Sequence, residues 1–191
     1  MAEGDFLDDR RRASEDDYFR KKDRELIEKM RNAATHDRAK HEMSAKTGLN
    51  DPALLEELDA LGFTPETISV LPLVPIVQVA WAEGGITAAE RTLLVRLARA
   101  RGIAEGSPAD RQLSDWMAQQ PSPDVFARAT RLIRAMLDAG SSEGGRLSAD
   151  DLIKYSESIA AASGGILGIG KISPDERATL AQIVATLKAR G

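Results

Sequence analysis

The chain has 191 residues and a net charge of −4; 42% of its residues are hydrophobic, 4% are aromatic and none is cysteine. This length allows one ordinary domain plus an extension, and a core of aliphatic side chains favours helices. The lack of cysteine excludes disulfides and thiolate metal sites and fits a reducing compartment, so we expect a cytoplasmic protein.

Residues 1–47 are the most polar part of the chain. They hold 12 basic and 12 acidic residues, whereas residues 48–191 hold 14 and 18. An arm that binds nucleic acid would carry net positive charge, because it must neutralise phosphates. The balanced charge therefore argues against DNA or RNA as a partner. The first residues contain no apolar stretch, so we expect no secretory signal.

Opposite charges four residues apart predict a helix over about residues 15–46, which a capping box at Ser14 and Asp17 would start. Each such pair contributes about 0.2–0.5 kcal/mol. The pairs are Asp16 with Arg20, Asp17 with Lys21, and Glu25 with Lys29.

The apolar side chains of this charged arm form one narrow stripe of Phe19, Leu26, Met30 and Ala33/Ala34, beside an adjacent Tyr18. A helix with so little apolar surface is marginal alone and gains burial when a partner supplies a groove. The aromatic pair therefore either docks on a protein partner or folds back on the rest of the chain. Disorder or self-association of the arm is a third alternative.

Residues 48–191 carry repeated helix start and stop signals and no alternating pattern long enough for a sheet. Capping boxes are expected at Thr87/Glu90, Ser148/Asp151 and Ser173/Glu176, proline at the first helical position after Thr64, Ser107, Ser122 and Ser173, and helix ends at Gly62, Gly102 and Gly140. We predict an all-α fold with a charged arm over 1–47 and a helical bundle over 48–191. The expected helices after the arm are 51–61, 65–71, 73–83, 88–101, 108–119, 123–138, 149–163 and 174–190.

The longest apolar run, residues 68–82, should form the centre of the bundle. It is shorter than the roughly 20 residues that span a bilayer, and it contains Pro72, Pro75 and Gln78. We therefore expect no direct membrane insertion. Trp81 should bury its ring and find an acceptor for its indole N–H.

Two segments share one plan, a helix, a Gly-Gly pair, a loop and a helix that begins Ile-(Thr/Ser)-x-x-Glu-Arg. The first copy runs through Ile86–Arg91 and the second through Ile172–Arg177, which predicts two similar helical hairpins. The second copy includes Gly165-x-x-x-x-Gly170-Lys171, the start of a phosphate-binding loop, but Ile172 follows where Ser or Thr is needed. We interpret it as a connection that tucks Ile166, Leu167 and Ile169 into the core, with anion binding as the alternative.

The segment LPLVPIVQVAWAEGGITAAERTLLVRLA resembles the TerB-like (tellurite resistance) helical family, and the likeness covers about residues 64–190. The resemblance implies a compact all-helical domain and a possible divalent cation near the acidic turn. Glu83 and Glu90 are the candidate ligands, although hard cations need several converging oxygens. The alternative is that Glu90 caps its helix and Glu83 is solvated.

Catalytic chemistry has few candidates, and we predict that the chain is not an enzyme. The only histidines, His36 and His41, lie in the charged arm and are about 140° apart on a helix, so they form no shared ligand face. Arg128, Arg131 and Arg134 share one helix face; we expect it to be solvated, with Arg134 paired to Asp138, and an anion site is the alternative.

The arm segment EDDYFRKKDRE is similar to the inhibitory segment of the ATP synthase inhibitor family, over about residues 10–31. The residues that carry the resemblance, and that we expect to bind a partner together with Leu26 and Met30, are Glu15, Tyr18, Phe19, Arg20, Lys22, Arg24 and Glu25. The resemblance implies a helix that wedges between catalytic subunits of the rotary ATPase and blocks ATP hydrolysis. We therefore expect a regulatory protein whose arm docks on a protein partner. The alternative is a stress-response module whose bundle binds divalent cations or proteins.

Overall fold

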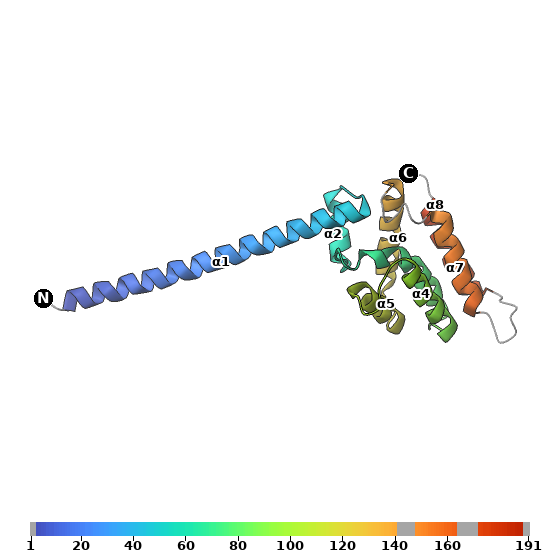
Figure 1. Ribbon diagram of the computed structural model, residues 1–191, viewed down its shortest axis with the longest axis horizontal. Coiled ribbons are helices and arrows are strands. Elements are labelled where there is room, and N and C mark those ends of the chain that lie inside the picture. Colours follow the sequence, from blue (N-terminus) through green and yellow to red (C-terminus); the bar gives the residue numbers. More distant parts are fainter. Residues whose placement is uncertain (1–2, 141–147, 164–171, 189–191) are drawn as a thin grey trace. The chain divides into compact units, whose positions relative to one another are not determined.

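The computed structural model describes residues 3–140, 148–163 and 172–188, and for residues 3–17 and 163 only the backbone. Within these ranges the chain is all-α, as predicted, and contains no strand (Figure 1). The helices are α1 (Glu3–Thr47), α2 (Pro52–Ala60), the 3-10 helix η1 (Ile68–Leu73), α3 (Val74–Ala80), α4 (Ala88–Ala100), α5 (Pro108–Ala118), α6 (Pro123–Asp138), α7 (Ala149–Ser163) and α8 (Pro174–Lys188).

The chain divides into two compact units, residues 1–41 and residues 42–191. The first unit consists of most of α1, which begins at Glu3. This start lies 12 residues before the expected one, and no proline between Glu3 and Ser14 interrupts the helix. The capping box expected at Ser14 and Asp17 falls on side chains outside the described set.

The last turn of α1 belongs to the second unit. Met43 is 5% exposed and Thr47 is fully buried. The ammonium group of Lys46 donates a hydrogen bond to the carbonyl of Pro65, and Gly48, with φ +71°, ends the helix. The bundle unit thus starts a few residues before the boundary between 47 and 48 that the charge pattern suggested.

The helix expected over residues 65–71 is instead a turn followed by η1, and this is a correction to the sequence prediction. Pro72 has no N–H to donate to the carbonyl of Ile68, and its ring would clash with that carbonyl in an α-helix. The chain therefore uses the tighter 3-10 geometry there. Thr67, at the start of η1, accepts a hydrogen bond from the backbone N–H of Thr64 at 2.9 Å.

Helix α3 forms the centre of the second unit. Six of its seven residues are buried, and it packs against α6, α7 and α8 (Figure 1). The remaining residue, Gln78, is partly exposed. Despite this apolar segment, no helix in the described ranges is long and apolar enough to cross a membrane.

The C-terminal end of α5 is capped by side chains from the first hairpin. The indole nitrogen of Trp81 donates to the carbonyl of Trp116 at 2.8 Å, and the guanidinium of Arg91 donates to the carbonyl of Met117 at 3.0 Å. The last carbonyls of a helix have no hydrogen-bond partner within the helix. These two bonds therefore supply donors to the carbonyls of Trp116 and Met117. The acceptor expected for Trp81 is therefore found at the end of another helix.

Most start and stop signals act as the sequence predicted. The capping boxes at Thr87/Glu90, Ser148/Asp151 and Ser173/Glu176 are all formed. Proline occupies the first position of α5, α6 and α8, and Gly62, Gly102 and Gly140 have φ values of +80°, +82° and +63° after helix ends. The Gly-rich loop with Gly165, Gly170 and Lys171 lies outside the described residues.

The cap on α5 predicts the effect of replacing Trp81. In Trp81→Phe the carbonyl of Trp116 loses its donor, and the smaller phenyl ring gives up part of the packing of the indole. We expect the free energy of unfolding to fall by about 0.5–1.5 kcal/mol for the lost hydrogen bond, and further for the lost packing, measured by urea denaturation followed by circular dichroism. A variant as stable as the parent chain would show that water replaces the indole at no cost.

Candidate functional site

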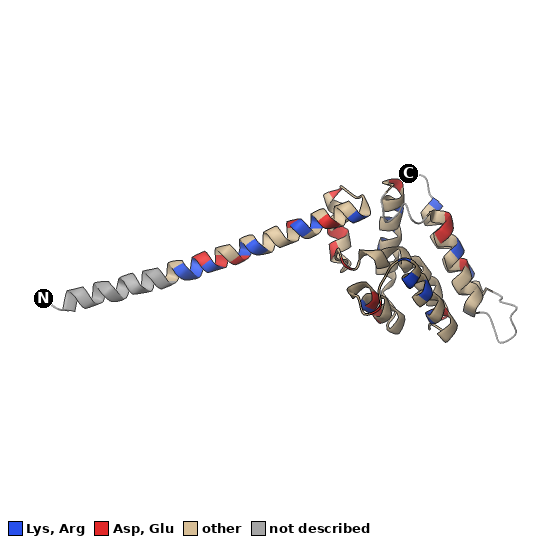
Figure 2. Cartoon of the chain, in the orientation of Figure 1, with Lys and Arg blue, Asp and Glu red and all other residues tan. Residues whose placement is uncertain are grey.

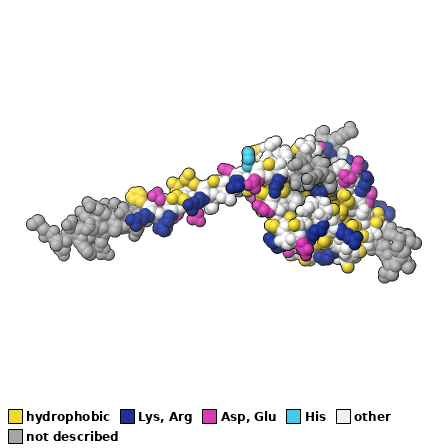
Figure 3. All heavy atoms as spheres, in the orientation of Figure 1, with side chains coloured by type: hydrophobic (Ala, Val, Ile, Leu, Met, Phe, Trp, Pro, Cys, Tyr) yellow, Lys and Arg dark blue, Asp and Glu magenta, His cyan; other side chains and the backbone are white. Residues whose placement is uncertain are grey.

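The first unit presents a row of exposed apolar side chains, which we name the α1 stripe: Tyr18, Phe19, Leu26, Ile27 and Met30. Their exposed fractions run from 48% for Ile27 to 65% for Met30. In Figure 3 hydrophobic side chains alternate with charged ones along the described part of α1. Soluble proteins tolerate single exposed apolar residues, but five within 13 positions of one helix mark a candidate interaction surface.

The aromatic pair at the start of the α1 stripe has a defined geometry. The rings of Tyr18 and Phe19 lie edge to face, with centroids 5.9 Å apart and planes at 73°. The ammonium group of Lys22 lies 5.8 Å from the centre of the Tyr18 ring and 3.6 Å from the carboxylate of Glu25. The two rings and this cation therefore form one small cluster on the helix surface.

The charged residues that the sequence singled out surround the α1 stripe. Arg20, Lys22, Arg24 and Glu25 are all exposed, and the Arg24 side chain donates to the carbonyl of Arg20 at 3.2 Å. Glu25 pairs with Lys22 three residues before it, in place of the expected Lys29. The Glu15 side chain lies outside the described set. Figure 2 shows both signs of charge interleaved along this part of α1, which suits a partner surface of mixed charge.

The two residues proposed as metal ligands occupy different environments. Glu90 is 2% exposed, and its Oε2 accepts from both the backbone N–H and the hydroxyl of Thr87, each at 2.7 Å. Glu83 is exposed. No three His, Cys, Asp or Glu side chains are placed to hold a metal ion anywhere in the part of the chain that the structure describes. The carboxylate of Glu90 therefore serves as a helix cap.

At two helix starts the same capping motif shifts the pKa of its carboxyl group in opposite directions. Burial raises the pKa of Glu90, against the effect of its Thr87 hydrogen bonds, and the carboxylates of Glu176 and Glu83 raise it further. The pKa of Asp151 is lowered, chiefly by the hydrogen bond from the backbone N–H of Ser148 and then by that from its hydroxyl. Since the hydrogen bonds are alike, solvation decides the direction of the shift.

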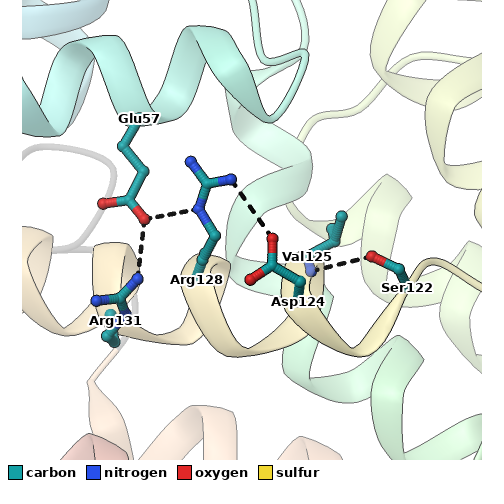
Figure 4. Close-up of polar contacts among 6 residues, drawn as sticks. All are labelled: Glu57, Ser122, Asp124, Val125, Arg128 and Arg131. Atoms are coloured by element: carbon teal, nitrogen blue, oxygen red, sulfur yellow. Dashed lines mark hydrogen bonds and ion pairs between the residues drawn. The ribbon is translucent and has the colours of Figure 1, made fainter.

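The arginine face of α6 is tied to acidic residues, as Figure 4 shows. Glu57 on α2 accepts from Arg128 at 2.9 Å and from Arg131 at 3.0 Å, and Arg128 also lies 3.5 Å from Asp124. Arg134 pairs with Asp138 at 2.8 Å, as predicted. Glu57 therefore joins α2 to α6, and the arginines are compensated without a bound anion.

The second unit also contains an open cavity of about 530 Å³, between the end of α3, the start of α6 and α8. Its walls include Gln78, Trp81, Gln120, Phe126, Thr179 and Gln182. This volume falls in the range of ligand pockets, roughly 300–1,000 Å³. The sequence analysis did not identify this site. The one feature of the sequence that pointed to it is Gln78, a glutamine in the middle of the most apolar helix.

Comparison of the chain with protein-family models, curated proteins and solved structures finds no significant match.

Replacing Glu90 with glutamine should change how stability depends on pH. The amide oxygen can still accept from Thr87, but the buried charge is gone. Because the folded-state pKa of Glu90 is raised, its favourable contribution is complete below the ordinary value of 4.5 and is lost as pH rises through the folded value. We expect Glu90→Gln to gain stability relative to the parent chain as the pH rises above 4.5, measured by urea denaturation at each pH.

Asp151→Asn is the matched control, because it alters a capping box of opposite pKa shift. The folded-state pKa of Asp151 is lowered, so its contribution is present above the ordinary value of 3.8 and is lost as pH falls through the folded value. This variant should be less stable than the parent chain at neutral pH, with a difference that closes in acid. If the stabilities of the two variants relative to the parent chain changed with pH in the same direction, the opposite pKa shifts of Glu90 and Asp151 would be contradicted.

Removing Glu57 should loosen the attachment of α2 to α6. Glu57→Ala leaves Arg128 and Arg131 without their shared acceptor, and we expect a loss of about 1–2 kcal/mol in unfolding free energy. Asp138→Ala breaks an ion pair within one helix and should cost about 0.3–0.5 kcal/mol. Equal losses in thermal or urea denaturation would mean that the link between helices contributes no more than an ion pair within one helix.

Proposed function

We propose that this chain is a non-enzymatic regulatory protein whose helix α1 docks on a protein partner through the α1 stripe. The observation that carries the proposal is the exposure of Tyr18, Phe19, Leu26, Ile27 and Met30 on one helix. Every described side chain from Tyr18 to Arg38 is exposed, so this helix has apolar surface available for burial in a complex.

The arrangement of the stripe suits a helix that lies in a groove. At about 100° per residue, Phe19, Leu26 and Met30 fall within an arc of roughly 40°, and Ile27 lies roughly 60° beyond it. Tyr18 lies to the other side, next to Phe19. Full burial of an aliphatic or aromatic side chain contributes about 1.5–3 kcal/mol, so a few anchors are enough for a specific complex. The flanking charges would then meet the rim of the groove.

The sharper form of the proposal names the rotary ATPase as the partner. Its support is the resemblance of residues 10–31 to the ATP synthase inhibitor family, carried by Tyr18, Phe19, Arg20, Lys22 and Arg24. In this form α1 inserts at an interface between catalytic subunits and restrains ATP hydrolysis. Edge-to-face packing of Tyr18 on Phe19 gives a compact aromatic head that could enter such an interface first.

We also propose a TerB-like arrangement for residues 64–190, in which the bundle carries the docking helix. Its support is the pair of hairpins α3–α4 and α7–α8, in each of which the second helix begins with a buried capping-box glutamate. The alternative function, divalent-cation binding at Glu83 and Glu90, has less support. Glu90 is already engaged by Thr87, and Glu83 is solvated.

The test replaces the aromatic pair. Tyr18→Ala with Phe19→Ala removes both anchors and leaves the charges unchanged. If the full chain inhibits ATP hydrolysis by purified rotary ATPase, the double variant should weaken inhibition about 30-fold or more, as the loss of hot-spot residues does. A chain lacking residues 1–41 should not inhibit, and a peptide of residues 8–46 should.

The matched control is Lys21→Ala with Glu28→Ala. These residues lie roughly opposite Phe19 on the helix, and their joint removal keeps the net charge. This variant should inhibit like the parent chain. No inhibition by the full chain or the peptide would remove the rotary ATPase as the partner. If affinity capture with the full chain and with the chain lacking residues 1–41 then retains the same proteins, the docking proposal itself fails.

A further inference from the structure

The cavity beside α3 is a second candidate site, and all of its walls come from the second unit, so it does not depend on the proposed role of α1. It opens between Gln78 and Trp81 of the first hairpin, Phe126 and Thr130 of α6, and Gln182 of α8. Its volume of about 530 Å³ can hold a small ligand.

The walls carry no uncompensated charge. Arg131 is the one charged residue among the lining side chains, and its guanidinium donates to Glu57 at 3.0 Å. Glu57 also accepts from Arg128, which Asp124 approaches at 3.5 Å, so these four groups balance. These charges sum to zero, so the described residues at the cavity offer no net counter-charge to an anionic or cationic ligand.

Three residues with primary amides line this space from separate elements, the partly exposed Gln78 on α3 and the exposed Gln120 before α6 and Gln182 on α8. None of the three side chains forms a hydrogen bond to another described residue. Gln78 is notable because every other residue of α3 is buried and apolar. Each amide offers two donors and one acceptor oxygen, the complement of a peptide group.

Two of the three threonine hydroxyl groups that line the cavity add acceptors. Thr130 donates to the carbonyl of Phe126 at 2.9 Å, and Thr186 donates to the carbonyl of Gln182 at 3.0 Å. Since each hydroxyl proton is used within its own helix, the oxygen lone pairs remain for a ligand N–H. Trp81 and Phe126 contribute the apolar part of the wall.

We propose that this cavity binds a short internal peptide segment, holding its main-chain amides with Gln78, Gln120 and Gln182 and an apolar side chain against Trp81 and Phe126. An internal segment fits better than a chain end, because no free charge is available for a terminal carboxylate or ammonium group. The site would therefore recognise uncharged main chain next to an aliphatic residue.

The test compares on the full chain two probes that share the residues leucine and alanine and differ in their ends. N-acetyl-leucyl-alanine methylamide has blocked ends, whereas leucyl-alanine has free ones. The blocked probe should shift the indole N–H resonance of Trp81 and the side-chain amide resonances of the three glutamines in NMR titrations, with a dissociation constant on the order of 1 mM. The free dipeptide should bind at least tenfold more weakly.

Variants at the rim locate the site without disturbing the core. Ala127 is exposed and lines the cavity, so Ala127→Trp should fill it and weaken the blocked probe at least tenfold. Ala178→Trp, at an exposed position of α8 outside the lining, is the control. Gln120→Leu should weaken binding, whereas Gln119→Leu, its exposed neighbour outside the lining, should not.

Three results would overturn the proposal. These are no resonance shift with the blocked probe at about ten times the expected dissociation constant, tighter binding of the free dipeptide, and full binding by a correctly folded Ala127→Trp variant. Each is independent of ATPase inhibition, so a failure here leaves the proposed role of α1 untouched. Retained binding after removal of residues 1–41 would confirm that the cavity acts alone.

Discussion

The second unit depends on the burial of one short helix. Helix α3 is apolar on nearly every side, so it is stable only where other helices cover it all round, and α6, α7 and α8 provide that cover. The 3-10 turns of η1 lead the chain into this position, because two prolines prevent a single longer α-helix. The residue that follows α3, Trp81, then reaches the end of α5 and fixes that helix as well.

Helix termini account for much of the remaining polar organisation. In an apolar interior, an unpaired backbone group costs more than a hydrogen bond gains, so caps are needed wherever a helix ends inside the unit. Glu90 shows the conflict that follows. Its carboxylate accepts a hydrogen bond from the backbone N–H of Thr87 at the start of α4. The same group is nearly out of contact with water and close to other carboxylates, and both conditions raise its pKa. Asp151 performs the same task near solvent without that penalty.

The sequence predicts this fold well where local chemistry decides the structure. Thr87 with Glu90, Ser107 with Pro108, and Gly102 each act on their own few residues, and the structure confirms them. Prediction fails where distant residues decide. The Glu57 link to Arg128 spans 71 positions, and the cavity takes walls from α3, α6 and α8. No local sequence pattern predicts contacts between residues so far apart along the chain. Gln78 stands out in the sequence as a polar residue in an apolar run, but the sequence does not predict which residues lie beside it in the fold.

The contact of Trp81 with Trp116 has a practical consequence. These are the only two tryptophans in the chain, whereas the α1 stripe carries a tyrosine and no tryptophan. One tryptophan lines the cavity, and its indole N–H is bonded to the backbone of the other. Selectively excited tryptophan emission is therefore an intrinsic optical reporter of the cavity and the α5 end alone. The charged helix has only Tyr18 as an intrinsic fluorophore, and α7 carries the other tyrosine, Tyr155, so events on the charged helix call for a separate label.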